Sequence, residues 1–263
     1  MAKPFLEDSS RLDRQVESLR LRRSENKMDD ARKVLDEVFD RRTLLAVYKF
    51  MTSETIDTID FPISTGKEGN VFRVTTHEGE FLALKIFRIN TATFHSIARY
   101  IEGDPRFKGL SGSKRKLIYA WTVKEYKNLC RMQEAGIRVP EPIDFHENLL
   151  LMEYLGTPEM PAPAIRNVEL EEPEEVYKEI LKFMKLAFKK AELVHGDLSE
   201  YNILWHEDKP WIIDCGQSLT ADHPNAEEFL KRDIKNINRY FRSLDVKIKS
   251  EEEILRSIKG VKK

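Results

Sequence analysis

The chain has few cysteines, no long apolar run and no excess of either charge. Its 263 residues include two cysteines, Cys130 and Cys215, whose separation matches no zinc spacing, so we expect reduced thiols rather than a disulfide framework. No apolar run approaches the roughly 20 residues of a membrane-spanning helix. The formal net charge is −1, so nucleic-acid binding would need a local basic patch. Because no apolar signal segment opens the sequence, we expect a soluble, cytoplasmic protein of one large domain or two lobes.

The most informative motif runs from His195 to Asn202 and is followed by Asp214. It reads H-G-D-L-S-E-Y-N, and a D-C-G begins at Asp214. Protein kinases carry H-R-D-x-x-x-x-N and then D-F-G, in which one carboxylate acts on the acceptor hydroxyl while an Asn and a second Asp hold Mg²⁺. We therefore expect Asp197 to orient or deprotonate the acceptor, and Asn202 and Asp214 to bind Mg²⁺ or Mn²⁺. Gly196 stands where ordinary kinases have Arg.

A glycine-containing loop and a lysine strand precede this motif. Residues 64–71 fit G-x-G-x-x-G-x-V with Ser in the first Gly position, and L-A-L-K at 82–85 matches the V-A-I-K position. The order of these four parts along the chain predicts an ATP site, with Lys85 as a catalytic residue that holds the α- and β-phosphates. The expected nucleotide-binding loop residues are Ser64, Thr65, Gly66, Lys67, Glu68, Gly69, Asn70 and Val71.

Two further segments complete the predicted nucleotide site. Apolar spacing predicts a helix from Lys114 to about Ala135, and Glu125 on this helix is the candidate partner of Lys85. The apolar run that starts at Leu149 predicts a buried strand leading into a linker between lobes. There the backbone of Glu153 and Leu155 would hydrogen-bond to adenine, with Met152 lining the pocket.

The resemblance of these motifs to those of protein kinases implies an α+β, two-lobed, protein-kinase-like fold, with a small β-rich N-lobe and a truncated helical C-lobe, and the remaining periodicities fit it. We expect a polar segment and helix over 1–50, an N-lobe over 51–152 with a flexible loop at 90–113, and a C-lobe over 153–263. The N-lobe strands are expected at 56–61, 71–75 and 80–87, and 157–175 reads as a surface loop. The C-lobe elements are expected as helices at 176–192, 225–241 and 251–258, and as short strands at 193–195, 203–205 and 211–213.

These motifs together resemble the RIO family of atypical serine/threonine protein kinases, and within it the first subfamily in its archaeal form. The phosphate loop (64–71), the catalytic loop (195–202) and the helix around 223–237 carry the resemblance. It implies ATP and Mg²⁺ as cofactors, and a role in maturation of the small ribosomal subunit. It also implies that Asp214 accepts phosphate as an aspartyl intermediate, so that the enzyme works as an ATPase-driven switch as well as a kinase.

Other functions stay open at this point. Small-molecule kinases of the aminoglycoside and choline type also use H-G-D-x-x-x-x-N, although they generally carry more helical structure after the metal-binding Asp than residues 217–263 permit. A nucleotide-switched ribosome-assembly scaffold without catalysis is another alternative. Residues 217–263 also contain no A-P-E, so we expect no extended peptide-binding platform.

Partners are suggested by serines and by clusters of basic residues. Ser111 and Ser113 lie in polar, Gly-containing sequence beside basic residues, so we expect any autophosphorylation there. Basic clusters could contact ribosomal RNA in a small-subunit precursor, and no membrane partner is expected. The clusters comprise Arg20, Arg22, Arg23, Lys108, Lys114, Arg115 and Lys116.

Overall fold

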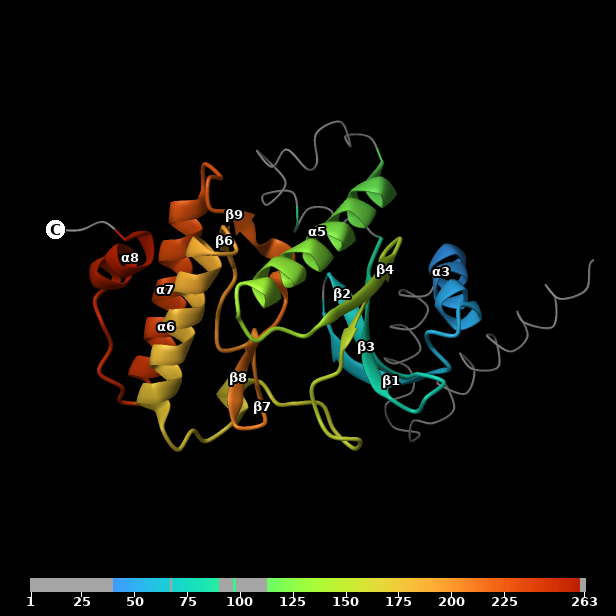
Figure 1. Ribbon diagram of the computed structural model, residues 1–263, viewed down its shortest axis with the longest axis horizontal. Helices are drawn as coiled ribbons and strands as arrows, with labels where there is room; N and C mark the ends of the chain where they lie inside the picture. Colours follow the sequence, from blue (N-terminus) through green and yellow to red (C-terminus); the bar gives the residue numbers. More distant parts are fainter. Residues whose placement is uncertain (1–39, 67, 90–96, 98–112, 261–263) are drawn as a thin grey trace, which may run out of the picture. The chain divides into compact units, whose positions relative to one another are not determined.

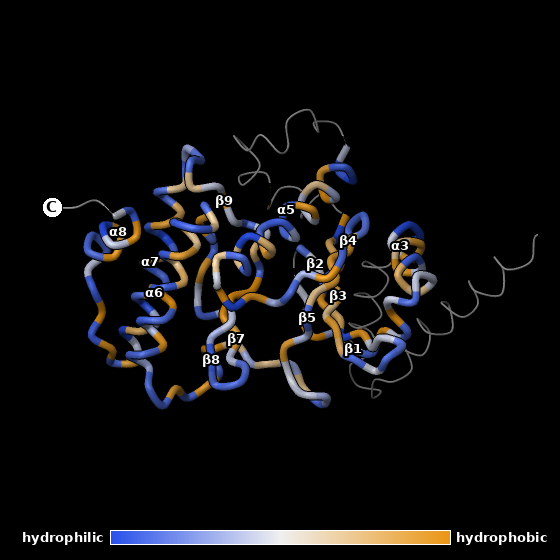
Figure 2. The backbone as a smooth tube through the Cα atoms, in the orientation of Figure 1, coloured by the Kyte–Doolittle hydropathy of each residue, from blue (hydrophilic) through white to orange (hydrophobic). Residues whose placement is uncertain are grey.

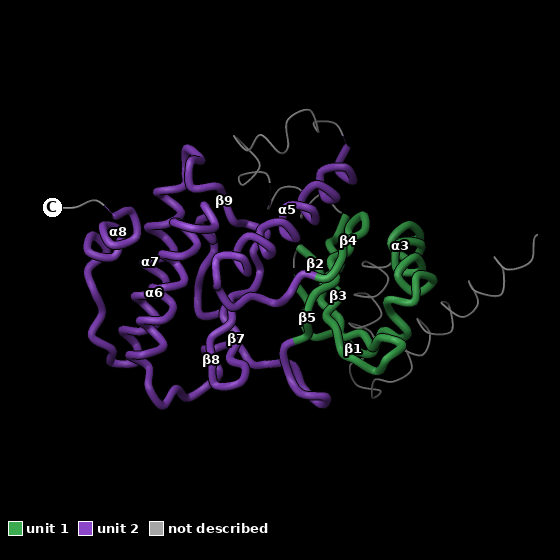
Figure 3. The backbone as a smooth tube through the Cα atoms, in the orientation of Figure 1, with its two compact units in different colours: residues 1–94, 143–154 green, residues 95–142, 155–263 purple. Residues whose placement is uncertain are grey.

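The computed structural model describes residues 40–66, 68–89, 97 and 113–260. The chain forms two compact units, residues 1–94 with 143–154 and residues 95–142 with 155–263 (Figure 3). Each unit is described by itself below. Three earlier predictions lie wholly or largely outside the described residues: the polar segment before Asp40, Lys67 of the phosphate loop, and the loop at 90–113.

A five-stranded sheet forms the first unit, with strand order β1-β2-β3-β5-β4. The strands are β1 (Thr58–Thr65), β2 (Gly69–Thr75), β3 (Phe81–Phe87), β4 (Pro142–His146) and β5 (Leu149–Glu153). The pairs β1–β2, β2–β3 and β3–β5 are antiparallel, as expected for a β-rich N-lobe. We did not predict β4, whose sequence reads as the exit from the preceding helix. Its first residue is Pro142, and proline is tolerated there because β4 is an edge strand.

Helix α3 (Arg41–Thr52) supplies the apolar cover of one sheet face. Asp40 caps it, since its carboxylate accepts the N–H of Thr43 at 2.8 Å. The buried side of α3 consists of Thr43, Ala46, Val47 and Phe50. The core between helix and sheet consists of Ala46, Val47, Phe50, Ile56, Ile59, Phe72, Val74, Leu84, Ile86, Leu149 and Leu151.

The second unit is built from helices and two short antiparallel ribbons. Its helices are α5 (Lys114–Glu134), α6 (Pro173–Lys189), α7 (Ala226–Arg242) and α8 (Glu251–Lys259), and α6, α7 and α8 pack against one another (Figure 1). One ribbon pairs β6 (Leu193–Val194) with β9 (Leu219–Thr220), and the other pairs β7 (Ile203–His206) with β8 (Lys209–Ile212). Hydrophilic and hydrophobic residues alternate along α6 and α7, as in amphipathic helices that expose one face to solvent (Figure 2).

The segment at 157–175 is not wholly the surface loop that we expected. It contains a 3₁₀ turn, η2 (Ile165–Asn167), in which Ile165 is fully buried. The Ile165 carbonyl accepts the hydroxyl of Tyr240 at 3.0 Å, and the Pro163 carbonyl accepts the N–H of Trp205 at 2.8 Å. Among the described helices, none combines the length and apolar character that crossing a bilayer requires.

Candidate active site

The expected phosphate loop connects β1 to β2. Ser64 and Thr65 end β1, Gly66 follows exposed, and its N–H donates to the Gly69 carbonyl at 2.9 Å. The Glu68 carbonyl accepts the N–H of Arg88 at 2.9 Å, and the Arg88 guanidinium donates to the buried Asn70 side chain at 3.2 Å. Backbone hydrogen bonds therefore hold the loop at Gly66 and at Glu68 and Gly69.

Lys85 lies on the sheet face opposite the α3 core. In an antiparallel sheet, directly paired residues share a face, and residues two apart in one strand do so too. Lys85 pairs with Val71 on β2, while Ala83 pairs with Met152 on β5. Lys85, Val71 and Met152 therefore share one face, whereas Leu84 and Ile86 point into the core. The Lys85 side chain is buried, with its ammonium 4.9 Å from the centre of the Phe87 ring.

The expected adenine-binding segment continues from this face. Met152 and Glu153 end β5 and are half-buried. Leu155, the first residue of the chain's return to the second unit, is buried, and its carbonyl accepts the N–H of Ala162 at 2.9 Å.

In the second unit, the catalytic loop runs from β6 to β7 and brings Asp197 and Asn202 together. The Asn202 amide donates to the Asp197 carbonyl at 2.9 Å and to its carboxylate at 3.3 Å. The main-chain carbonyl of Asn202 accepts the N–H of Ile213 at 3.0 Å. The residue just before Asp214 is therefore bound to the same asparagine. Asp197, Asn202 and Asp214, which are expected to carry the chemistry, therefore lie on two backbone segments that Asn202 joins.

His195 bridges the catalytic loop and the Asp214 segment. Its Nε2 lies 3.1 Å from the Ile213 carbonyl, and its Nδ1 accepts the N–H of Asp197 at 3.3 Å. Because a carbonyl can only accept, this network assigns the neutral tautomer with the proton on Nε2. Asp214 follows with φ 61°, a left-handed conformation that six other non-glycine residues of the described chain also adopt.

The charges around Asp197 act in opposite directions. Burial raises the pKa of the Asp197 carboxyl group above its ordinary value, and the negative charge of Asp214 adds to this rise. The Arg232 guanidinium and the hydrogen bond from Asn202 lower it, as does His195 in its protonated form. A raised carboxyl pKa beside a second carboxylate is a common feature of catalytic sites.

Glu125 and Asn128, both buried on α5, approach the turn after Asp214. A Cβ placed on Gly216 would lie 2.8 Å from the Glu125 carboxylate and 3.0 Å from the Trp121 indole nitrogen. The Asn128 amide donates to the Cys215 carbonyl at 2.8 Å. Helix α5 therefore fixes the D-C-G turn. We did not predict Asn128 as a site residue.

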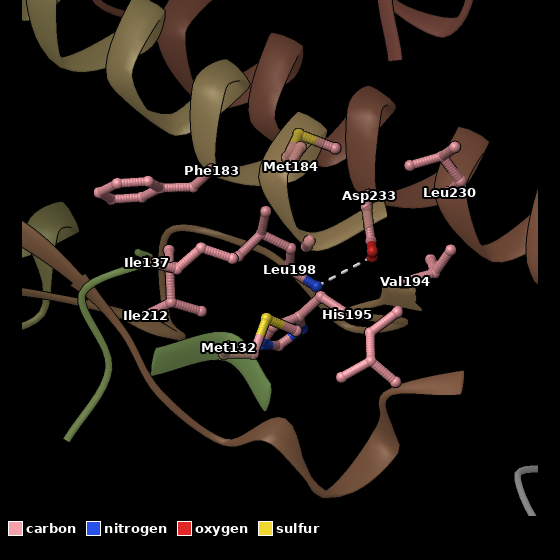
Figure 4. Close-up of a pocket in the computed structure, with 12 residues that line it drawn as sticks. Met132, Ile137, Phe183, Met184, Val194, His195, Leu198, Ile212, Leu230 and Asp233 are labelled. Atoms are coloured by element: carbon pink, nitrogen blue, oxygen red, sulfur yellow. Dashed lines mark hydrogen bonds between the residues drawn. The ribbon is translucent and has the colours of Figure 1, made fainter. Parts of the chain in front are cut away.

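Helix α7 holds the catalytic loop from the other side. The buried Asp233 carboxylate accepts the N–H groups of Gly196 at 2.8 Å and Leu198 at 2.9 Å, so it grips both neighbours of Asp197. Figure 4 shows the bond to Leu198 beside a small cavity of about 20 Å³ lined mostly by apolar side chains. That volume suits about one water molecule, so this cavity is a packing space behind the loop and not a substrate site.

Comparison with known proteins decides the family. The RIO domain model matches residues 70–254, more than half of the chain. The chain belongs to the RIO family of protein kinases. This membership confirms the resemblance drawn from the motifs, and it favours a protein kinase over the small-molecule alternative.

Relatives of this RIO-family chain are named as kinases. It is 42% identical over 232 residues to the RIO-type serine/threonine-protein kinase Rio1 of Haloferax volcanii, covering 88% of this chain and 79% of that one. It is 38% identical over 227 residues to human serine/threonine-protein kinase RIO1, covering 85% of this chain and 40% of the human one. The Rio2 kinase of Chaetomium thermophilum, solved as an ADP/Mg²⁺-phosphoaspartate complex, shares the fold with a TM-score of 0.65 at 22% identity, covering 95% of this chain and 86% of that one.

Proposed function

We propose that this RIO-family protein transfers the γ-phosphoryl group of ATP to serine or threonine hydroxyls. The observation that carries the proposal is the joined arrangement of Asp197, Asn202 and Asp214, in which one asparagine binds both acid-bearing segments. In this proposal Asp197 orients the acceptor hydroxyl and Lys85 holds the phosphates. Phosphoryl transfer depends chiefly on positioning and charge stabilisation, which suits a site built from rigidly held loops.

Mg²⁺ would be shared between protein and nucleotide. Within the described residues, no three His, Cys, Asp or Glu side chains gather as a self-sufficient metal site. Asn202 and Asp214 would supply two oxygen ligands, and Mg²⁺ usually completes its octahedron with water and substrate phosphates. When bound, the ion neutralises phosphate charge. The protein's part is to hold those two side chains in place.

We further propose that Asp214 accepts phosphate and that the protein works in part as an ATPase. Its place beside the segment that holds Asp197 and Asn202 supports this, as does the phosphoaspartate of the fungal Rio2 structure. Incubation with terminally labelled ATP and Mg²⁺ tests both activities at once. Label on Asp214 is released by hydroxylamine, whereas phosphoserine resists it. Label found only on serine would remove the aspartyl intermediate, and no label or released phosphate at all would remove the enzymatic function.

Autophosphorylation is proposed at Ser111 or Ser113. Ser111 lies outside the described residues. Ser113 is half-buried and caps α5, since its hydroxyl accepts the N–H of Lys116 at 3.4 Å. A phosphate there would meet the positive end of the helix and nearby basic side chains. Phosphopeptide mapping of Ser111→Ala and Ser113→Ala variants separates the two sites, and label that survives both changes would place the site elsewhere.

The proposed partner is a precursor of the small ribosomal subunit. Lys114 and Lys116 are exposed at the start of α5, with Arg115 half-buried between them, while the basic residues at 20–23 and Lys108 lie outside the described part of the chain. If several of these side chains meet RNA phosphates, affinity falls steeply with salt. Sedimentation with small-subunit precursors should show binding that Lys114→Glu with Lys116→Glu weakens. The control pair Lys182→Glu with Lys185→Glu, exposed on α6, should not. Equal binding by both pairs would remove this surface from the proposal.

A further inference from the structure

The catalytic loop has no room for an arginine in front of Asp197. Gly196 has φ 81°, and a Cβ at this position would lie 2.8 Å from the Gln217 carbonyl oxygen. An L-residue would be strained by the positive φ and would collide with backbone. The positive charge that the ordinary kinase motif carries at this position must therefore be absent or come from another element.

Arg232, from the first half of α7, brings a positive charge to this place. Its guanidinium donates a hydrogen bond to the Gly196 carbonyl and lies 4.0 Å from the Asp197 carboxylate. The same guanidinium lies 4.6 Å from the centre of the Phe229 ring, and this contact restricts the orientation of the Arg232 side chain. The side chains of Arg232 and Asp197 are 38% and 43% exposed, so both remain within reach of a bound acceptor.

The neighbours of Arg232 on α7 bind the same short stretch of backbone. Asp233 accepts the N–H groups on either side of Asp197, as described above, and Asn236 donates to the Leu198 carbonyl at 3.2 Å. Residues three and four positions apart on a helix are neighbours on one face, and Asn236 is three positions from Asp233 and four from Arg232. Residues 232, 233 and 236 therefore form one continuous contact with residues 196–198.

Helix α7 is itself held firmly. Tyr177 on α6 donates its hydroxyl proton to Asn238 at 2.7 Å, and Tyr240 donates to the Ile165 carbonyl at 3.0 Å. Both tyrosine residues are buried, so these hydrogen bonds are protected from water. A guanidinium fixed to such a helix can set the position of a carboxylate more accurately than a surface side chain on a loop.

We propose that Arg232 is a positioning residue for phosphoryl transfer: it fixes the Gly196 peptide and holds the Asp197 carboxylate toward the acceptor. The guanidinium lies 4.0 Å from that carboxylate and donates to the carbonyl of the preceding residue, so the two contacts together fix the place of the carboxylate. This inference rests on the proposed kinase function, and it concerns kcat rather than nucleotide binding.

The first test replaces Arg232 with Met, which keeps an unbranched apolar stem beside Phe229 but removes charge and donors. We expect kcat to fall about 10- to 100-fold, since small misplacements of a reacting group have effects of this order. The KM for ATP should stay within about threefold of wild type. Arg232→Lys should recover part of the loss, because the charge returns without the forked geometry. Wild-type kcat in Arg232→Met would overturn the proposal.

A second test separates positioning from a purely structural role. In Arg232→Ala, added guanidinium ion at non-denaturing concentration should restore part of kcat, whereas a structural defect would not respond. The matched control is Arg242→Ala, an exposed arginine at the end of the same helix, which should keep wild-type kcat and show no response. A loss in Arg232→Ala that neither guanidinium nor Lys relieves would overturn the proposal. Absence of any transfer or hydrolysis by wild type would instead overturn the kinase function on which it rests.

Discussion

Asp233 should make the stability of the protein depend on pH in an unusual direction. Its side chain is 1% exposed, and burial raises its pKa from 3.8 to about 7, against the opposing effect of the N–H groups of Gly196 and Leu198. Between these two pH values the folded protein binds a proton that the unfolded chain has lost. The contribution of this group is therefore fully present below pH 3.8 and is lost as pH rises through about 7.

The size of this effect follows from the shift. A rise of about three pH units corresponds to about 4 kcal/mol, at about 1.4 kcal/mol for each unit. Asp233→Asn is neutral at every pH. We therefore expect the free energy of unfolding of the variant, minus that of wild type, to increase by about 4 kcal/mol between pH 4 and pH 8. Activity should nevertheless be lost, because the amide has one acceptor oxygen for two N–H donors.

Urea denaturation of both proteins across this pH range measures the difference directly. Subtracting wild type removes every titration that the two proteins share. Asp245→Asn is the matched control: it lies exposed just after the same helix, in a left-handed conformation that Asn also tolerates, and its difference from wild type should stay flat. If the Asp233→Asn difference is also flat within about 1 kcal/mol, burial does not dominate at this carboxyl and the reasoning is wrong.

Three further outcomes are expected. Asp197→Asn should lower turnover by about 10²–10⁴-fold with ATP affinity within a few-fold, as kinetics and nucleotide titration can show; undiminished turnover would remove it from the mechanism. Transfer should stop in EDTA and in Asp214→Ala, and activity in EDTA would contradict the metal's part. Gly196→Ala should lose turnover, and urea denaturation should show a larger loss of stability than in Gly79→Ala. Both glycines have positive φ, but of the two only Gly196 has a backbone atom, the Gln217 carbonyl oxygen, in the way of an added Cβ. Equal losses of stability would mean that this close approach is relieved without consequence.

The order of the chemical motifs could be predicted from the sequence because each motif is local. The motif that contains Asp197 and Asn202 depends on a spacing within one loop, and the strand pattern around Lys85 depends on alternation within a few residues. In the structure the Asn202 amide donates to the Asp197 carboxylate, and Lys85, Val71 and Met152 share a sheet face. Their parts in catalysis and binding stay predictions.

What could not be predicted are the contacts between residues far apart in sequence. Asn128 binds the Cys215 carbonyl across 87 positions, and Asp233 binds the Gly196 N–H across 37. One signal was available for both. Asp233 lies on the apolar stripe of α7, between Leu230 and Ile237, and Asn128 lies on the buried face of α5. A polar residue at an apolar helical position needs a partner, but periodicity alone does not say which backbone it meets.

The short path from Asp214 to β9 limits how this kinase can be regulated. Strand β9 begins at Leu219 and pairs at once with β6, next to the catalytic loop. The turn between them, η3 (Cys215–Gln217), is held by Asn128 on α5. Ordinary kinases insert a long segment here whose phosphorylation orders the site. In this chain buried side chains of α5 and α7 already hold both loops, so their order does not require a phosphorylated segment between Asp214 and β9.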